Sequence, residues 1–140
     1  MKELFAVDGK TAVITGGSGA LGGAMADGLA AAGCKVAVLG TTVSKVDRKV
    51  KDLQDRGGRA LGLVGDVLDR SSLEQCRAEV LSEWGAVDIL INCAGGNLPG
   101  ATILPEESIF DLSLEDFDRV TALNLKGSIL PVLVFGKTMA

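Results

Sequence analysis

The sequence contains no histidine and no tyrosine. Without histidine, zinc loses its commonest nitrogen ligand, and Cys34, Cys76 and Cys93 do not have the spacing of metal ligands. We therefore expect no metal site, and we expect each cysteine to be a small buried hydrophobic side chain in a reducing compartment. An active site that relies on a tyrosine as acid–base group cannot be complete within these 140 residues.

The chain also lacks a basic stripe and a long apolar run. Its net charge is -4, and the lysines and arginines between positions 45 and 51 alternate with aspartates, which is typical of a solvated helix face. No apolar stretch is expected to reach transmembrane length, and the N-terminus does not resemble a signal peptide. We expect a cytoplasmic protein with a small-molecule substrate and with neither nucleic acid nor membrane as a partner.

Short apolar runs alternate with helical patterns along the chain. The runs at 11–15, 35–39, 60–64 and 87–91 are apolar on both faces, as strands must be when helices cover both sides of their sheet. Helices are expected between these runs, and a strand–helix–strand order implies parallel strands with right-handed crossovers. The predicted fold class is α/β, a Rossmann-type doubly wound parallel sheet that is truncated after about four strands.

Each predicted helix has an apolar stripe that we expect to face the sheet. The stripes are Leu21, Met25 and Leu29; Val43, Val46, Val50 and Leu53; and Leu73, Cys76, Val80 and Trp84. The third helix begins either at Asp69 or at the capping box Ser71-Ser72-Leu73-Glu74.

Residues 94–113 read as a long loop, a length that usually has a functional reason. A last helix is predicted from about Ser113, with Phe117, Val120 and Asn124 on one face and a kink at Pro131. Because the chain ends inside this helix, we expect a longer parent protein.

The first predicted strand leads into a glycine-rich turn. Its sequence, Gly17-Ser18-Gly19-Ala20-Leu21-Gly22, has the pattern G-x-G-x-x-G at a strand–helix junction. Glycines let the backbone approach a pyrophosphate closely, and the helix that follows points free N–H groups at the anion. No Gly-Lys-Ser/Thr follows, which disfavours a phosphate-loop ATPase. The turn therefore predicts nucleotide binding.

Three further strand ends carry candidate ligand-binding residues. Gly40-Thr41-Thr42 follows the second strand and contains neither the carboxylate typical of NAD sites nor the arginine typical of NADP sites. The threonines can donate to a phosphate, with Lys45 or Arg48 nearby, so we lean slightly to NADP, although either threonine can instead cap the next helix. Asp66-Val67 can hold an adenine, unless Asp66 is a turn residue, and Asn92 either borders the cofactor or ties strands together.

Together these segments resemble the short-chain dehydrogenase/reductase family. The resemblance rests on Thr15-Gly16 through Gly22, Gly65-Asp66-Val67, Asn92-Cys93-Ala94-Gly95 and Leu123-Asn124-Leu125-Lys126-Gly127, in the family's order. It implies a pyrophosphate and ribose site at Gly16, Ser18 and Leu21, within the turn that also contains Gly17, Gly19 and Gly22. It further implies an adenine site at Asp66 and Val67, and a ribose site at Asn92, Ala94 and Gly95.

The same resemblance implies that Asn124 belongs to the family's catalytic set of Asn, Ser, Tyr and Lys. The other three residues would follow the next strand, so residues 1–140 would be the N-terminal NAD(P)-binding part of a single Rossmann domain, without its C-terminal half. We expect the parent to be an NAD(P)-dependent dehydrogenase or reductase, and the 140-residue chain alone to be inactive. The alternative is a non-catalytic module that senses the nucleotide.

Two segments resemble one subgroup of this family, the D-mannonate (fructuronate) oxidoreductase-like enzymes. They are the loop around Ala94-Gly95-Gly96-Asn97 and the terminal segment Val134-Phe135-Gly136-Lys137-Thr138-Met139. The resemblance implies a sugar-acid substrate. It also implies a homo-oligomer that forms through the helix beginning near Ser113.

Overall fold

Four parallel strands form the centre of the computed structural model, which describes residues 3–140. They are β1 (Thr11–Thr15), β2 (Lys35–Gly40), β3 (Arg59–Val64) and β4 (Ile89–Asn92), in the sheet order β3-β2-β1-β4. Every residue of β1 is buried, because this strand has a neighbour on each side and helices on both faces. The predicted α/β fold with a Rossmann-like parallel sheet is confirmed.

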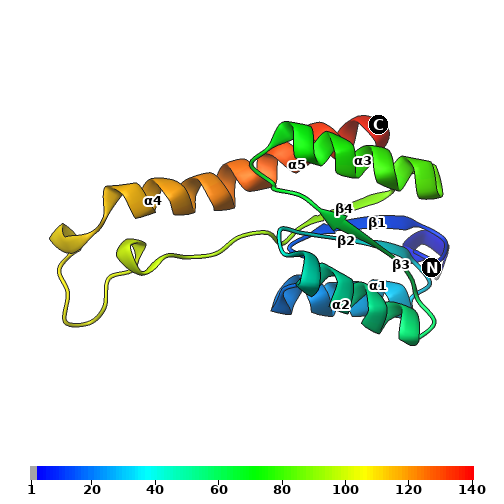
Figure 1. The fold of residues 1–140 in the computed structure, drawn as a ribbon, viewed down its shortest axis with the longest axis horizontal. Helices are drawn as coiled ribbons and strands as arrows, with labels where there is room; N and C mark the ends of the chain where they lie inside the picture. Colours follow the sequence, from blue (N-terminus) through cyan, green and yellow to red (C-terminus); the bar gives the residue numbers. More distant parts are fainter. Residues whose placement is uncertain (1–2) are drawn as a thin grey trace.

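Helices cover both faces of the sheet (Figure 1). On one face, α1 (Ala20–Ala31) and α2 (Val43–Asp55) pack over a core that includes Ile14, Val38, Val46 and Leu53. On the other, α3 (Arg70–Trp84) and α5 (Gly127–Phe135) pack over a second core. That core includes Val13, Leu63, Leu73, Val80 and Phe135. The N-cap of α3 is Asp69, whose side chain accepts a hydrogen bond from the Ser71 N–H, so the alternative start at Ser71 is wrong.

The predicted apolar stripe of α1 is wrong for Leu21 and Met25, whereas Leu29 is partly buried and packs against the core as predicted. Leu21 and Met25 are exposed, and the residues that α1 buries are Gly22, Gly23 and Ala26. Small residues on this face let the helix axis approach the sheet closely, so the larger side chains must point away from it. In α2, Val46 and Leu53 are buried as predicted, whereas Val43 at its first position is exposed.

Beyond β4 the chain leaves the sheet and forms an extended structure, which we call the arm (residues 96–126; Figure 1). The arm contains the short 3-10 turns η2 (Pro99–Ala101) and η3 (Ile109–Asp111), the helix α4 (Leu114–Thr121) and the π-helical turn η4 (Ala122–Lys126). The helix α4 begins after Ser113, as predicted, and the Ser113 side chain caps it by accepting from the Asp116 N–H. None of these four elements contains a buried residue.

The helical stretch from α4 through α5 to η5 (Gly136–Thr138) has two notable properties. The π-helical turn η4 ends just before Gly127. Because Pro131 has no N–H group, the carbonyl oxygen of Gly127 lacks its usual helical hydrogen-bond donor. The stretch Leu114–Thr138 has 25 residues and contains an 18-residue window with a mean hydropathy of 1.2, so by length and composition alone it could cross a membrane. This corrects the expectation that no segment reaches that length, which overlooked a helix interrupted by a few charges. The core helix of a soluble protein passes the same test, and α5 packs on α3 and β4.

Candidate functional site

The turn between β1 and α1 is built so that only glycine fits at two positions. Gly16 has a φ of +64°, and a Cβ there would lie 2.8 Å from the backbone nitrogen of Ala94. A Cβ on Gly22 would overlap the carbonyl oxygen of Gly16. The turn is also tied to β2, because the Gly17 N–H donates to the Leu39 carbonyl oxygen over 3.1 Å. The result is a tight backbone loop pressed against the end of the sheet.

The N-terminus of α1 emerges from this turn without a cap. Its N-cap residue is Gly19, no side chain bonds to the first-turn N–H groups, and the first turn contains no acidic residue. The N–H groups of a first helical turn have no acceptor within their own helix, and the helix dipole makes this end positive. An anion such as a pyrophosphate is therefore favoured here.

Thr15 joins the ends of β1 and β4. It is fully buried, and its hydroxyl oxygen accepts from the backbone N–H groups of Cys93 and Ala94, each over 3.1 Å. This pair of bonds fixes the strand end after β4 against the glycine-rich turn. The sequence contained a signal for this role, because Thr15 is the hydroxyl residue that ends an otherwise apolar strand, but the role was missed.

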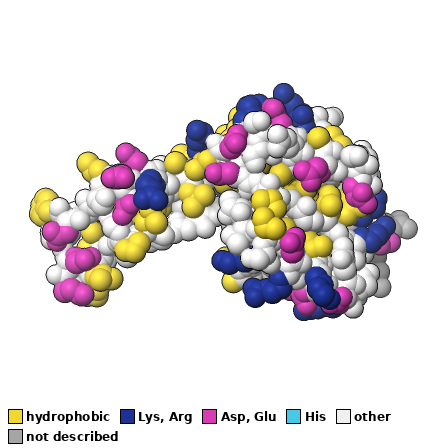
Figure 2. Space-filling view, in the orientation of Figure 1, with side chains coloured by type: hydrophobic (Ala, Val, Ile, Leu, Met, Phe, Trp, Pro, Cys, Tyr) yellow, Lys and Arg dark blue, Asp and Glu magenta, His cyan; other side chains and the backbone are white. Residues whose placement is uncertain are grey.

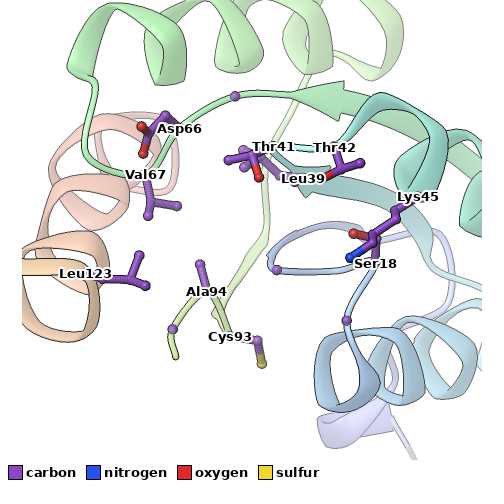
Figure 3. A pocket seen from close by; sticks show the side chains of 15 residues that line it. Ser18, Leu39, Thr41, Thr42, Lys45, Asp66, Val67, Cys93, Ala94 and Leu123 are labelled. Atoms are coloured by element: carbon purple, nitrogen blue, oxygen red, sulfur yellow. The ribbon is translucent and has the colours of Figure 1, made fainter. Parts of the chain in front are cut away.

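A cleft of about 370 Å³ opens beyond the carboxyl ends of the strands (Figure 3). Nine of the predicted site residues line it: Gly16, Ser18, Gly19, Gly40, Thr41, Asp66, Val67, Ala94 and Gly95. Figure 3 shows Asp66, Val67 and Leu123 on one wall, and Ser18 and Lys45 on the opposite wall. Residues distant in sequence thus converge where parallel sheets bind ligands.

Five predicted residues do not line the cleft: Gly17, Leu21, Gly22, Asn92 and Asn124. Gly17 and Gly22 lie behind its wall, where they shape the turn, and the Leu21 side chain is exposed. Asn92, expected beside the cofactor, instead lines a separate cavity between β4 and α5. Side chains alternate between the faces of a strand, and this alternation turns Asn92 away from the cleft. Its buried Oδ1 has no hydrogen-bond partner among residues 3–140.

The two alternatives for Asp66 coexist in the structure. Its Oδ1 accepts from the Leu68 N–H over 2.8 Å, which is a turn-forming bond, and the residue also lines the cleft. Val67 beside it is buried and offers an apolar surface. For Thr42 the capping alternative is not seen, because it occupies the N-cap of α2 without a side-chain cap bond. Its side chain borders the cleft with Thr41 and Lys45.

Asn124 connects the arm to the cleft. Its Nδ2 donates to the carbonyl oxygens of Gly96, over 2.7 Å, and Val120, over 2.8 Å, while its Oδ1 accepts from the Gly96 N–H over 3.2 Å. The amide therefore pairs with both backbone groups of one loop residue. The Asn124 carbonyl oxygen accepts a further bond from the Ser128 hydroxyl. Asn124, predicted to share one face with Phe117 and Val120, is exposed rather than buried, and its amide is satisfied by bonds to the loop that follows β4.

The three cysteines differ more than the sequence suggested. Cys34 and Cys76 are buried as predicted, and burial raises the pKa of both thiols, that of Cys76 to about 11. Cys93 is only partly buried, lines the cleft and lies 3.4 Å from the sulfur of Met25. Its expected role as a buried hydrophobic residue is therefore wrong. It follows the last residue of β4, where the chain is already leaving the sheet.

Comparison with known proteins gives the same assignment as these features. The family model for short chain dehydrogenases matches residues 10–140. An uncharacterized oxidoreductase, UxuB, of Bacillus subtilis is 46% identical over 139 residues, which are 94% of this chain and 50% of the relative. The D-threitol dehydrogenase of Mycolicibacterium smegmatis is 33% identical over 135 residues, which are 96% of this chain and 49% of the relative.

Solved structures agree in fold. A protein assigned provisionally as a D-mannonate oxidoreductase from Haemophilus influenza, solved with bound NAD, superimposes with a TM-score of 0.88 at 34% identity. That match covers 95% of this chain and 51% of the other. The chain spans about half the length of the curated relatives that it matches.

Proposed function

The chain belongs to the short-chain dehydrogenase family, and on that premise we propose that the whole protein is an oxidoreductase that transfers hydride between a nicotinamide dinucleotide and a carbonyl or alcohol carbon. The relatives with a stated activity are dehydrogenases, which does not favour the alternative of a non-catalytic sensor. The observation that carries the proposal is the glycine cradle in front of the uncapped α1 helix. A Cβ at Gly16 or Gly22 would fill this cradle.

The residues of the cleft fit such a dinucleotide. Gly16, Ser18 and Gly19 would hold the pyrophosphate at the positive end of α1. Asp66 and Val67 would hold the adenine, by a carboxylate acceptor and an apolar surface. Ala94 and Gly95 would line the ribose on the nicotinamide side. The absence of a carboxylate after β2 favours NADP over NAD for this chain.

Within the proposed reaction the chain supplies position rather than the reacting group. The dinucleotide, when bound, carries the hydride. Asn124 holds the loop that follows β4 through both backbone groups of Gly96, which fixes the floor on which the nicotinamide would rest. The acid–base residues would come from the rest of the protein, because the family's Ser and Tyr-x-x-x-Lys lie beyond the matched half.

For the substrate we propose a sugar acid such as fructuronate or mannonate. The support is the likeness of the loop from Gly95 to Thr102 to that subgroup, together with the provisional assignment of the structural relative. The test is the reduction of fructuronate by the whole protein, monitored as the loss of the absorbance of the reduced nicotinamide. D-Threitol, the substrate in another relative's name, serves as the comparison substrate. Turnover of neither compound, nor of related sugar acids, by folded protein would overturn the substrate assignment.

We further propose that the whole protein forms a homo-oligomer through α4 and α5. The supporting observation is a set of half-exposed apolar side chains on these helices and on the turn η4 between them: Phe117, Leu125, Ile129, Val132 and Leu133. Figure 2 shows hydrophobic side chains along the arm. Sedimentation of the whole protein tests this proposal, and a monomer at micromolar concentration would contradict it.

A further inference from the structure

Two sulfur atoms from distant parts of the chain face each other beside the cleft. The Cys93 thiol lies 3.4 Å from the Met25 sulfur, although the two residues are 68 positions apart in sequence. Cys93 follows β4, whereas Met25 lies in the second turn of α1. Figure 3 shows the Cys93 sulfur pointing away from Asp66 and Val67. The fold thus creates a pair of sulfur ligands that spacing along the sequence could not reveal.

Core packing does not account for this contact. Neither Cys93 nor Met25 belongs to one of the two apolar cores, and Met25 is 43% exposed. A methionine that only filled a gap between apolar side chains would lie within a core. Both residues instead remain partly accessible to solvent, so a solute can reach the pair.

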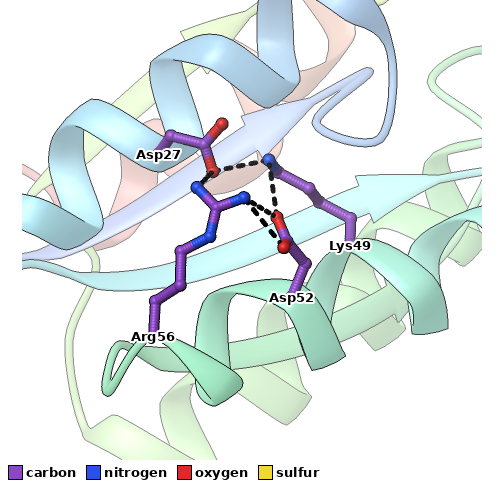
Figure 4. Close-up of polar contacts among 4 residues, drawn as sticks. All are labelled: Asp27, Lys49, Asp52 and Arg56. Atoms are coloured by element: carbon purple, nitrogen blue, oxygen red, sulfur yellow. Dashed lines mark hydrogen bonds and ion pairs between the residues drawn. The ribbon is translucent and has the colours of Figure 1, made fainter.

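The backbone is held in place on both sides of the pair. The Cys93 N–H donates to the carbonyl oxygen and to the hydroxyl oxygen of Thr15, each over 3.1 Å. The helix α1 is tied to α2 by an ion pair, in which the Lys49 ammonium lies 2.6 Å from Asp27 Oδ1 (Figure 4). The two sulfur atoms therefore project from fixed elements, and the unbranched Met25 side chain can adjust the distance between them.

The chemistry of the two ligands restricts the metal ion that they can hold. Thiolate and thioether sulfurs are soft ligands, which select Cu(I), zinc or iron–sulfur clusters. Zinc and iron–sulfur clusters are held by larger sets of cysteine, histidine or carboxylate ligands. Among residues 3–140 no three such side chains come together. Cu(I) accepts a low coordination number, so it is the soft ion that a two-sulfur site suits.

We propose that Cys93 and Met25 form a binding site for Cu(I). This inference goes beyond the proposed function and does not depend on it. On binding, the cation forms bonds to both sulfur atoms and displaces the thiol proton, which passes to the solvent. No electron is transferred in this step.

The experiment measures Cu(I) binding by the whole natural protein without oxygen, in competition with a coloured Cu(I) chelator. The wild type should bind one more Cu(I) ion than Cys93→Ser. Met25→Leu should weaken this site about tenfold or more, because the loss of a ligand costs at least as much as the loss of a group that supports one. Zn²⁺ should not displace the Cu(I).

The matched control is Met139→Leu. Met139 is 44% exposed, against 43% for Met25, but among residues 3–140 each of the three thiols contacts a group other than Met139. This substitution should leave the affinity for Cu(I) unchanged. Leucine and methionine have similar volumes, so both variants should retain the fold, which circular dichroism checks.

Two results would overturn the inference. One is an equal number of bound Cu(I) ions, with equal affinity, in the wild type and in Cys93→Ser. The other is a Met25→Leu variant that binds Cu(I) as tightly as Met139→Leu does, because the thioether would then not be a ligand. Neither result concerns dinucleotide binding, so the proposed function would stand in both cases.

Discussion

The body of the molecule, from β1 to β4, and the arm that follows it are held together by different forces. In the body, apolar side chains on both faces of the sheet are fully buried within the chain itself. The arm is held mainly by local hydrogen bonds, such as those from the Ser113 N–H to the Gly100 carbonyl oxygen and from the Asn97 side chain to the Thr102 hydroxyl. Phe110 in the arm is 94% exposed. The cleft is built almost entirely on the body, and the arm contributes Leu123.

This difference indicates where rigidity is supplied. A nucleotide site needs a fixed backbone, and the body provides it through close packing of glycine turns against strands. The arm has apolar surface that the chain does not cover, as expected for a segment that meets other parts of the protein. Gly95, the residue before the arm, lies against Asn124 beside the cleft, and Asn124 in turn bonds to Gly96 at the start of the arm.

The largest effect is expected from Gly22→Ala. The added methyl would overlap the Gly16 carbonyl oxygen, so the turn must shift, which should lower the free energy of unfolding by about 3 kcal/mol and abolish dinucleotide binding. Thermal denaturation and calorimetry measure the two effects.

The matched control is Gly28→Ala in the same helix. Gly28 is exposed and a Cβ there meets nothing within 4 Å, so alanine should stabilise by about 1 kcal/mol through helix propensity. Equal effects of the two substitutions would show that the turn is not tightly packed.

A smaller effect is expected at the junction of body and arm. A Cβ on Gly95 would lie 2.6 Å from Asn124 Oδ1, so Gly95→Ala should displace the amide and weaken its bonds to Gly96. Hydrogen exchange should then speed up in α4 while β1 and β2 stay protected. Gly96→Ala is the control, because the nearest neighbour of a Cβ there is a leucine methyl at 3.8 Å. Unchanged hydrogen exchange of α4 in Gly95→Ala would contradict the expectation that contact with Gly95 fixes the Asn124 amide.

Thiol labelling should distinguish the cleft from the two cores. An aromatic disulfide reagent should modify Cys93 first, because Cys34 and Cys76 are buried and have raised pKa values. Saturating NADP should slow this reaction severalfold by covering the cleft. Cys93→Ser should lack the fast reaction. A labelling rate that does not respond to the dinucleotide would place the ligand elsewhere.

The smallest effect concerns the edge of the body opposite the cleft. Asp88 accepts the Thr11 N–H over 2.8 Å, and this bond, together with Lys10, holds the pKa of its carboxyl below the usual value. A lowered folded-state pKa means that the stabilisation is present above the unfolded pKa and is lost as the pH falls through the folded pKa.

Between about pH 6 and about pH 3, the free energy of unfolding of the wild type should therefore fall by at most about 1 kcal/mol more than that of Asp88→Asn. Denaturant unfolding at the two pH values measures this difference. An identical loss in the two proteins would contradict the role of the Asp88 charge.

The sequence predicted the body better than the arm. Buried strands such as 11–15 and 35–39 are visible because uninterrupted apolar runs have one structural explanation. The glycine pattern likewise located the turn. The face of α1 was missed because close packing there uses glycine and alanine, which carry no apolar periodicity. Lys45, which was expected near a bound phosphate, does line the cleft, but Cys93 was not assigned to it because its position depends on how the chain leaves β4. The shape of the arm depends on local polar bonds that no spacing reveals.

The central claim is that the turn from Gly16 to Gly22 holds the pyrophosphate of a nicotinamide dinucleotide. A crystal structure of the whole protein grown with NADP tests it most directly. The account predicts pyrophosphate density at the N-terminus of α1, adenine beside Asp66 and Val67, and the ribose phosphate facing Lys45. Density for the dinucleotide at any other place, or an anion-free α1 terminus at saturating NADP, would contradict it.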